Sequence, residues 1–220
     1  MKRIILSIIV AGIWGLCFCA SPAQAEPITI AIEAVVDRVD DPSSYLGGKI
    51  KTGDIIAGTY TYDSSTLDSN PSPSVGDYQH FDPPAGIFLS VGGFDFQTDP
   101  ANVYFLIEVA NDHPWFDPDI NKDNYLLISY NNLPLSNDTL VDDISWQLDD
   151  RSGQALSNTS LPLTAPVLGD WQDGNSLRVE GVPRQTDFFI DAHVISAIPE
   201  PGTLILLSLG GLLLRFRTKS

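Results

Sequence analysis

The sequence predicts an all-β protein, an antiparallel β-sandwich of jelly-roll or immunoglobulin-like kind, and three observations lead to that prediction. Of the 28 acidic residues, 23 are Asp, which favours turns, and only five are Glu, which favours helices. The 17 Gly and 16 Pro residues supply frequent breaks between elements. Apolar and polar residues alternate in short runs, and no window of comparable length has a helical period.

The predicted strands are short, and clusters of Gly, Asn, Asp, Pro and Ser separate them. In the first strand Ile28, Ile30 and Ile32 fall on one face and Thr29 on the other, which is the period of an extended chain with one buried face. Trp146 is in phase with its apolar neighbours and is predicted to lie in the core. Eight or nine such strands predict a sandwich. The main runs are residues 28–36, 55–62, 87–91, 103–109, 125–131, 144–148, 177–182 and 188–198.

Two polar segments, residues 63–77 and 111–124, are predicted to be exposed loops. The second contains oxygen-bearing side chains at alternate positions, which resembles the start of a calcium-binding loop. These candidate Ca²⁺ ligands are Asp117, Asp119, Asn121 and Asp123. The pattern departs from an EF-hand because Lys122 stands where the sharp turn needs Gly and Ile128 where a bidentate Glu closes the site. The alternative interpretation is a solvated turn in an Asp-rich chain.

Residues 1–25 are predicted to be a signal peptide, which is helical while it crosses the membrane. They combine a basic start, an apolar stretch and small residues at Ala23 and Ala25, where signal peptidase would cleave after Ala25. Both cysteines, Cys17 and Cys19, lie in this segment, so the exported domain has no disulfide and no cysteine nucleophile. That domain, residues 26–198, holds 27 acids and seven bases, and a net charge of −20 excludes nucleic acid as a partner.

The C-terminal segment, residues 199–220, has three parts: Pro199-Glu200-Pro201, an uncharged apolar run over 202–214 and a basic end over 215–220. A helix of that length covers about 20 Å, less than the roughly 30 Å of a hydrocarbon core. We interpret the run as a short transmembrane helix. The basic end, with Arg215 and Arg217, is expected to remain in the cytoplasm.

This arrangement resembles the PEP-CTERM sorting signal of Gram-negative bacteria. The motif is Pro199, Glu200 and Pro201, and the family's Arg-rich end corresponds to Arg215 and Arg217, although Phe216 and Thr218 interrupt it here. The resemblance implies export through the inner membrane, a transiently anchored precursor, and processing by signal peptidase and an exosortase. It also implies association with exopolysaccharide and biofilm matrix at the cell surface. A plain tail anchor is the alternative.

No catalytic constellation is evident in the sequence. The three histidines, His80, His113 and His193, are not accompanied by a nucleophile or a metal set, and we expect them to be solvated. Trp115 and Trp171 lie in polar loops, where an exposed ring could stack on a sugar. The alternative is that each ring folds back to close one end of the sandwich.

The sequence therefore predicts a non-enzymatic exported protein, sorted to the cell surface or extracellular matrix, with a structural, matrix or adhesion role. A carbohydrate-binding module for exopolysaccharide is the alternative. A secreted glycan hydrolase is a second alternative, which requires two carboxylates brought together by the fold. No cofactor other than Ca²⁺ is predicted.

Overall fold

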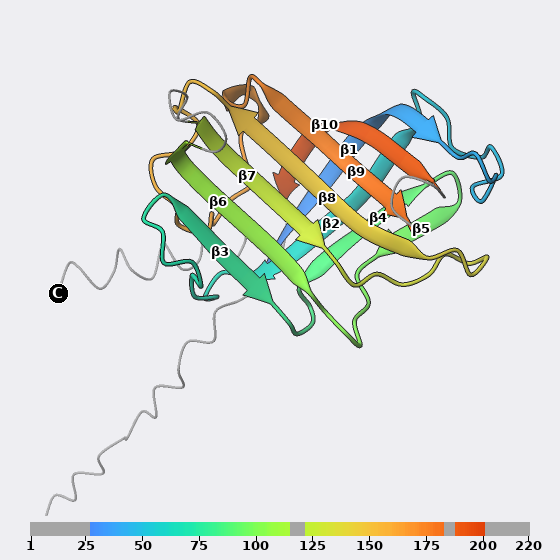
Figure 1. Ribbon diagram of the computed structural model, residues 1–220, viewed down its shortest axis with the longest axis horizontal. Helices are drawn as coiled ribbons and strands as arrows, with labels where there is room; N and C mark the ends of the chain where they lie inside the picture. Colours follow the sequence, from blue (N-terminus) through green and yellow to red (C-terminus); the bar gives the residue numbers. More distant parts are fainter. Residues whose placement is uncertain (1–26, 115–121, 183–187, 201–220) are drawn as a thin grey trace, which may run out of the picture.

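The computed structural model describes residues 27–114, 122–182 and 188–200, and nearly all of their regular structure is β-strand (Figure 1). The one helical element among them is the 3₁₀ turn η1, Leu168–Asp170. The strands are β1 (Pro27–Asp40), β2 (Ile55–Asp63), β3 (Val75–His80), β4 (Gly86–Val91), β5 (Phe94–Gln97), β6 (Phe105–His113), β7 (Lys122–Ser129), β8 (Val141–Asp150), β9 (Gly174–Gly181) and β10 (Phe189–Pro199).

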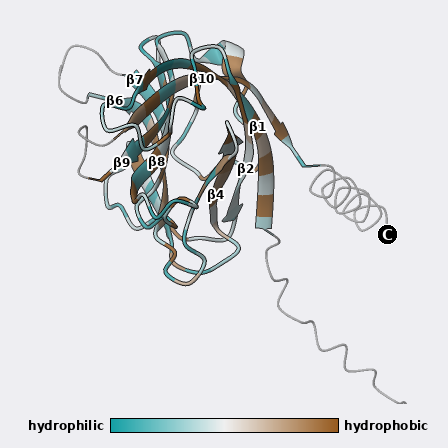
Figure 2. Ribbon diagram, turned by 90° about the vertical axis from the view of Figure 1, so that its right-hand side faces the viewer, coloured by the Kyte–Doolittle hydropathy of each residue, from teal (hydrophilic) through white to brown (hydrophobic). Residues whose placement is uncertain are grey.

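All ten strands belong to one antiparallel sheet in the order β3-β6-β7-β8-β9-β10-β1-β2-β4-β5. The sheet curls so that β6 to β9 face β1, β2 and β4 across the core, while β10 arches between the two halves (Figure 2). This confirms the all-β antiparallel class. The expected pair of separate sheets is not confirmed, because the hydrogen-bonded ladder is continuous. The pairing of β1 with β10 has irregularities at Glu33/Ala34 and Val36/Arg38, and such bulges bend and twist a long strand pair.

The core lies between the two halves and is built by the alternation seen in the sequence. Ile30 and Ala34 of β1 are fully buried, as is Trp146 of β8, which confirms its predicted place in the core. Aromatic rings join the halves: Tyr60 of β2 lies 6.0 Å from the Trp146 ring, and its hydroxyl is 3.3 Å from that of Tyr125 on β7. The two halves therefore share one core.

Two strands were not predicted, and both are short. β3 begins within the predicted loop 63–77, and Gly76 and His80 on its inward face leave no apolar period. β5 follows a two-residue turn at Gly92 and Gly93, whose φ angles of 60° and 80° suit the hairpin turn that requires left-handed backbone. The predicted loop 111–124 is also shorter than expected, because β6 and β7 extend into it.

The two predicted membrane-crossing segments are not among the described residues. The predicted signal peptide, residues 1–25, and the predicted transmembrane helix, residues 202–214, both lie outside them. Within the described ranges, no helix is long and apolar enough to cross a membrane.

Candidate ligand-binding surface

Three aromatic rings form a row on the outer face of the sheet, at one end of the neighbouring strands β3, β6 and β7. The register pairs His80 with Phe105 and Phe105 with Ser129, so the next residues outward along the strands are Phe81, Tyr104 and Tyr130. The centroids of the first two rings are 5.5 Å apart with an interplanar angle of 24°, and those of Tyr104 and Tyr130 are 4.7 Å apart. We call these three residues the aromatic row.

The aromatic row presents ring surface to solvent. Phe81 is 59% exposed and Tyr130 is 38% exposed, whereas Tyr104 between them is partly buried. The Phe81 ring stacks on Tyr104, and the rest of its apolar surface is open to a ligand. The row is therefore a surface that suits a flat, partly apolar ligand.

A polar cleft of about 320 Å³ adjoins the row, and Phe81, which belongs to the row, also lines the cleft. The cleft lies where β2 and β3 end and where the β3–β4 turn contains the cis peptide between Pro83 and Pro84. Its remaining lining residues are Pro27, Asp63, Thr66, Gln79, His80, Asp82 and Ala85. An aromatic wall beside carboxylate, amide and hydroxyl groups is the combination expected where a ligand needs both stacking and hydrogen bonds.

Two titratable groups of the cleft, Asp63 and His80, have shifted pKa values. Hydrogen bonds from the Ser65 backbone N–H at 2.8 Å and the Ser65 hydroxyl at 2.7 Å lower the pKa of Asp63, so its carboxylate is ionised. Burial lowers the pKa of His80, which is 5% exposed and packs edge-on against the Tyr62 ring. The expectation that this histidine is solvated is wrong, because it closes the cleft toward the core.

Buried hydrogen bonds hold the backbone beneath the row. The Tyr130 N–H donates to the Tyr104 carbonyl oxygen at 3.0 Å. The Ser129 hydroxyl, one residue earlier, lies 2.8 Å from the Thr98 hydroxyl and donates to Asn132 Oδ1 at 2.8 Å. Because Ser129 is fully buried and its partners come from two loops, these hydrogen bonds hold the backbone next to Tyr130 in place.

Two carboxyl groups face each other further along the same outer surface. Asp77 of β3 is the cross-strand partner of Glu108 of β6, and Asn70 Nδ2 donates to Asp77 Oδ2 at 3.1 Å. Burial raises the pKa of Glu108 to about 7, and the Asp77 charge and its hydrogen bond add to the effect. Glu108 therefore holds a proton well above the pH at which an ordinary glutamate loses it.

We expect Glu108→Gln to stabilise the protein above pH 7 and to leave it unchanged near pH 4. The folded-state pKa of Glu108 is raised from 4.5, so its stabilising proton is fully bound below that value and is lost as the pH rises through about 7. Glutamine imitates the protonated form. Allowing for partial exposure, the gain at pH 8 is about 1 kcal/mol, or roughly 2–4 °C in melting temperature.

Thermal unfolding of wild type and Glu108→Gln at pH 4 and pH 8 measures this effect. Glu33→Gln is the matched control, since Glu33 is exposed on β1. An equal difference between Glu108→Gln and wild type at both pH values would contradict the raised pKa.

The predicted calcium ligands are only in part described. Asp117, Asp119 and Asn121 lie outside the described residues, while Asp123 is completely buried at the start of β7. Its two carboxylate oxygens accept hydrogen bonds from the backbone N–H of Asp112 at 2.9 Å and of Leu156 at 2.7 Å. Asp123 thus ties the end of β6 and the loop after β8 to the start of β7. In the described part of the chain, no three His, Cys, Asp or Glu side chains converge as a metal site.

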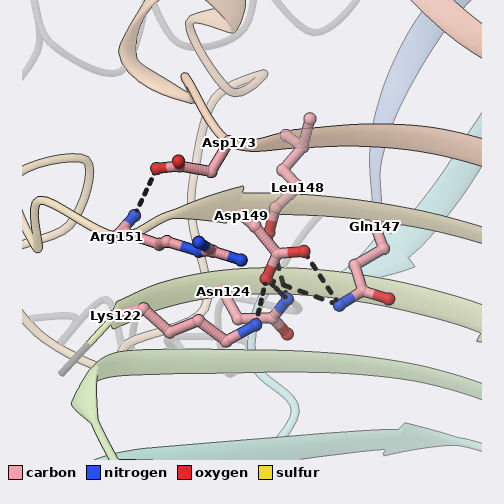
Figure 3. A network of polar contacts seen from close by, with 7 residues as sticks. All are labelled: Lys122, Asn124, Gln147, Leu148, Asp149, Arg151 and Asp173. Carbon is pink, nitrogen blue, oxygen red and sulfur yellow. Dashed lines mark hydrogen bonds and ion pairs between the residues drawn. The ribbon is translucent and has the colours of Figure 1, made fainter. Parts of the chain in front are cut away.

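Lys122, which breaks the calcium-loop pattern, has a structural partner instead. Figure 3 shows its ammonium group at the carboxylate of Asp149 on β8, 2.7 Å from Oδ1. The same carboxylate accepts from Asn124 Nδ2 at 3.0 Å and from Gln147 Nε2 at 3.2 Å. This network ties β7 to β8 on the outer face.

The two tryptophans predicted as stacking platforms are placed differently. Trp171 is 8% exposed, and its ring lies 6.5 Å from that of Tyr125, so the ring closes one end of the core as the alternative interpretation proposed. It offers little free ring face. Trp115 lies outside the described residues.

Sequence reasoning missed the aromatic row, although one signal was present. Each of its rings directly adjoins a strand end, and an aromatic residue there can extend the outward face of that strand. However, β3 itself was not predicted, and without its register Phe81 has no visible neighbour.

The sorting motif lies partly in the sheet and partly outside the described residues. Pro199 is the last residue of β10, and Glu200 follows it. Pro201, Arg215 and Arg217, like Ala23 and Ala25 of the signal peptide, are not described by the structure.

Comparison with known families identifies the C-terminal end of the chain. Residues 197–219 match the family model of the PEP-CTERM protein-sorting motif, which confirms the resemblance noted in the sequence. The motif implies an exported protein whose membrane-anchored precursor is processed by an exosortase. Comparison with curated proteins and with solved structures finds no match.

Proposed function

We propose that the mature domain is a non-enzymatic glycan-binding protein of the cell surface or extracellular matrix. The aromatic row beside the polar cleft carries this proposal. Stacking on exposed rings, combined with hydrogen bonds to nearby polar side chains, is a mode of binding that pyranose rings favour, because one sugar face is apolar and its edge carries hydroxyl groups.

The charge of the domain narrows the class of glycan. A net charge of −20 over residues 26–198 repels acidic polymers, and the cleft adds the carboxylates of Asp63 and Asp82. Neutral polysaccharides suffer no such repulsion, and carboxylates accept hydrogen bonds from their hydroxyl groups. A matrix or adhesion role then follows from attachment to a neutral component of the exopolysaccharide.

Binding is favoured over hydrolysis by the ionised state of the Asp63 carboxylate. Glycosidases need one carboxylic acid that keeps its proton near the working pH. The pKa of Asp63 is lowered instead. Glu108 has a raised pKa, but it is not among the residues that line the cleft.

Phe81→Ala is expected to weaken binding to a neutral polysaccharide about tenfold or more. The reason is that stacking of a flat ligand ring on one aromatic side chain contributes on the order of 1–3 kcal/mol. Affinity gel electrophoresis with dextran and hydroxyethylcellulose as embedded polymers measures the retardation. Tyr45→Ala is the matched control, since Tyr45 is 39% exposed and belongs to neither the row nor the cleft.

The outcomes separate the proposed roles. Retardation of the wild-type protein that Phe81→Ala removes and Tyr45→Ala leaves intact supports glycan binding at the row. Equal retardation of all three proteins, or none with any polymer, contradicts it. Shortening of the polymers during incubation would instead indicate a hydrolase.

A further inference from the structure

The folded domain continues directly into the sorting motif. Pro199 ends β10 and is paired with Ile30 of β1, and the backbone N–H of Glu200 donates to the Thr29 carbonyl oxygen at 2.9 Å. No linker therefore separates the sheet from Pro201. Whatever position the tail takes, the end of β10 is held beside it.

An apolar groove of about 500 Å³ lies along this end of β10. It is lined by residues 164–168 and 195–199, none of which is charged. Three large aliphatic side chains are open to solvent there: Val167 is 66% exposed, Ile195 is 49% exposed and Ile198 is 59% exposed. In a domain with a net charge of −20, an uncharged surface with several exposed aliphatic side chains indicates an interaction site.

The length of the tether determines what the groove meets. The apolar run of the tail reaches Leu204 four residues after Glu200. Four extended residues span at most about 14 Å, and the polar interface on each side of a bilayer is itself roughly 5–7 Å thick. With the apolar run in the membrane, as the sorting motif implies for the precursor, the groove lies at or next to the lipid headgroups.

We propose that this groove is the surface through which the folded domain of the precursor contacts the membrane interface. Val167, Ile195 and Ile198 enter the headgroup region, where aliphatic side chains gain from leaving water. The absence of charged lining residues allows this contact, because an acidic side chain at the same place would be repelled by anionic lipid headgroups. The contact fixes the motif at one depth and orientation for the membrane-embedded exosortase.

This inference is independent of glycan binding and rests on the sorting motif. The test uses the precursor after removal of residues 1–25, which contains no cysteine. Ile198→Cys is labelled with an environment-sensitive fluorophore, and the protein is reconstituted in phosphatidylcholine vesicles with a quencher attached to the lipid headgroup. Leu140→Cys is the matched control. Leu140 is 56% exposed, directly precedes β8 at Val141 and does not line the groove.

We expect the fluorophore at position 198 to be quenched at least twofold more strongly than the one at position 140, with a blue-shifted emission. Equal, weak quenching at both positions in protein that sediments with the vesicles would overturn the proposal. So would a fluorophore at 198 that stays in water until an exosortase is added, because the groove would then bind the enzyme and not the lipid.

A second variant tests the same contact without a label. Val167→Asp places a charge on a groove side chain that is already exposed and lies outside the matched motif, so folding and the motif are expected to be preserved. Processing of this precursor by membranes that contain an exosortase should be severalfold slower than that of wild type and of Leu140→Asp. Unchanged processing of Val167→Asp would show that membrane contact at the groove does not position the motif.

Discussion

Trp146→Ala is expected to lower the free energy of unfolding by about 3–5 kcal/mol, the range for removing a large buried aromatic side chain. The ring is fully buried on β8 and packs edge-on against Tyr60 at 6.0 Å and Tyr125 at 6.1 Å. Its Nε1 donates to Asn175 Oδ1 at 3.0 Å. Because Tyr60 belongs to the opposite half of the sheet, the substitution leaves a cavity where the two halves meet.

Urea unfolding followed by circular dichroism measures the loss, with Trp146→Phe as the control. Phenylalanine keeps most of the apolar volume but removes the hydrogen bond, so we expect about 1–2 kcal/mol for that variant. A loss below 1 kcal/mol for Trp146→Ala would mean that the two halves do not share one core. Equal losses for both variants would assign the effect to the hydrogen bond.

Asp150→Asn is expected to cost about 2–3 kcal/mol above pH 5, although it changes little in shape. Asp150 is 1% exposed, and its carboxylate accepts from the backbone N–H of Ser152 at 2.9 Å, of Gln154 at 2.9 Å and of Ala155 at 3.1 Å. Burial alone would raise the pKa of Asp150, but these bonds and the Ser152 hydroxyl lower it. In the variant, the side-chain amide nitrogen of Asn would face backbone N–H groups, from which it cannot accept hydrogen bonds.

The pH dependence of this variant has a definite sign. Since the folded-state pKa of Asp150 is lowered, its contribution is present above the unfolded value of about 4 and is lost as the pH falls through the folded-state pKa. The difference between wild type and Asp150→Asn should therefore shrink below about pH 4. The control is Asp95→Asn at an exposed position in β5, which should have the stability of wild type both above pH 5 and below about pH 4. A loss of stability for Asp150→Asn that stays the same at all pH values would contradict the charge-based account.

The proposed glycan-binding surface, the aromatic row, does not include the tryptophans that the sequence offers. A tryptophan in a polar loop is a candidate stacking platform because of its residue type. Trp171, however, packs against Tyr125 at the end of the core. Phe81 and Tyr104 are ordinary residues until the β3–β6 register sets them side by side. Exposure and proximity, and not residue type, single out the proposed binding surface.

The strands with clear alternation were predictable because burial on one face leaves a period of two in the chain. β1 and β8 follow that rule, and their inward residues include the apolar ones expected. β3 was not predicted because its inward residues include Gly76 and His80. A histidine and a glycine on the inner face give no apolar period to detect, although Tyr78 between them is buried.

By itself the sequence determined the local properties: strand-rich composition, the acidic charge of the domain, and a terminal sorting motif whose residues are consecutive. Such features need no knowledge of what lies beside what. The tertiary structure decided that the strands form one curled sheet, that Glu108 meets Asp77, and that the groove adjoins Pro199. Each of these features depends on pairing between residues that are distant in the chain. Register and burial set both the contacts and the pKa values, and neither can be read from the order of residues alone.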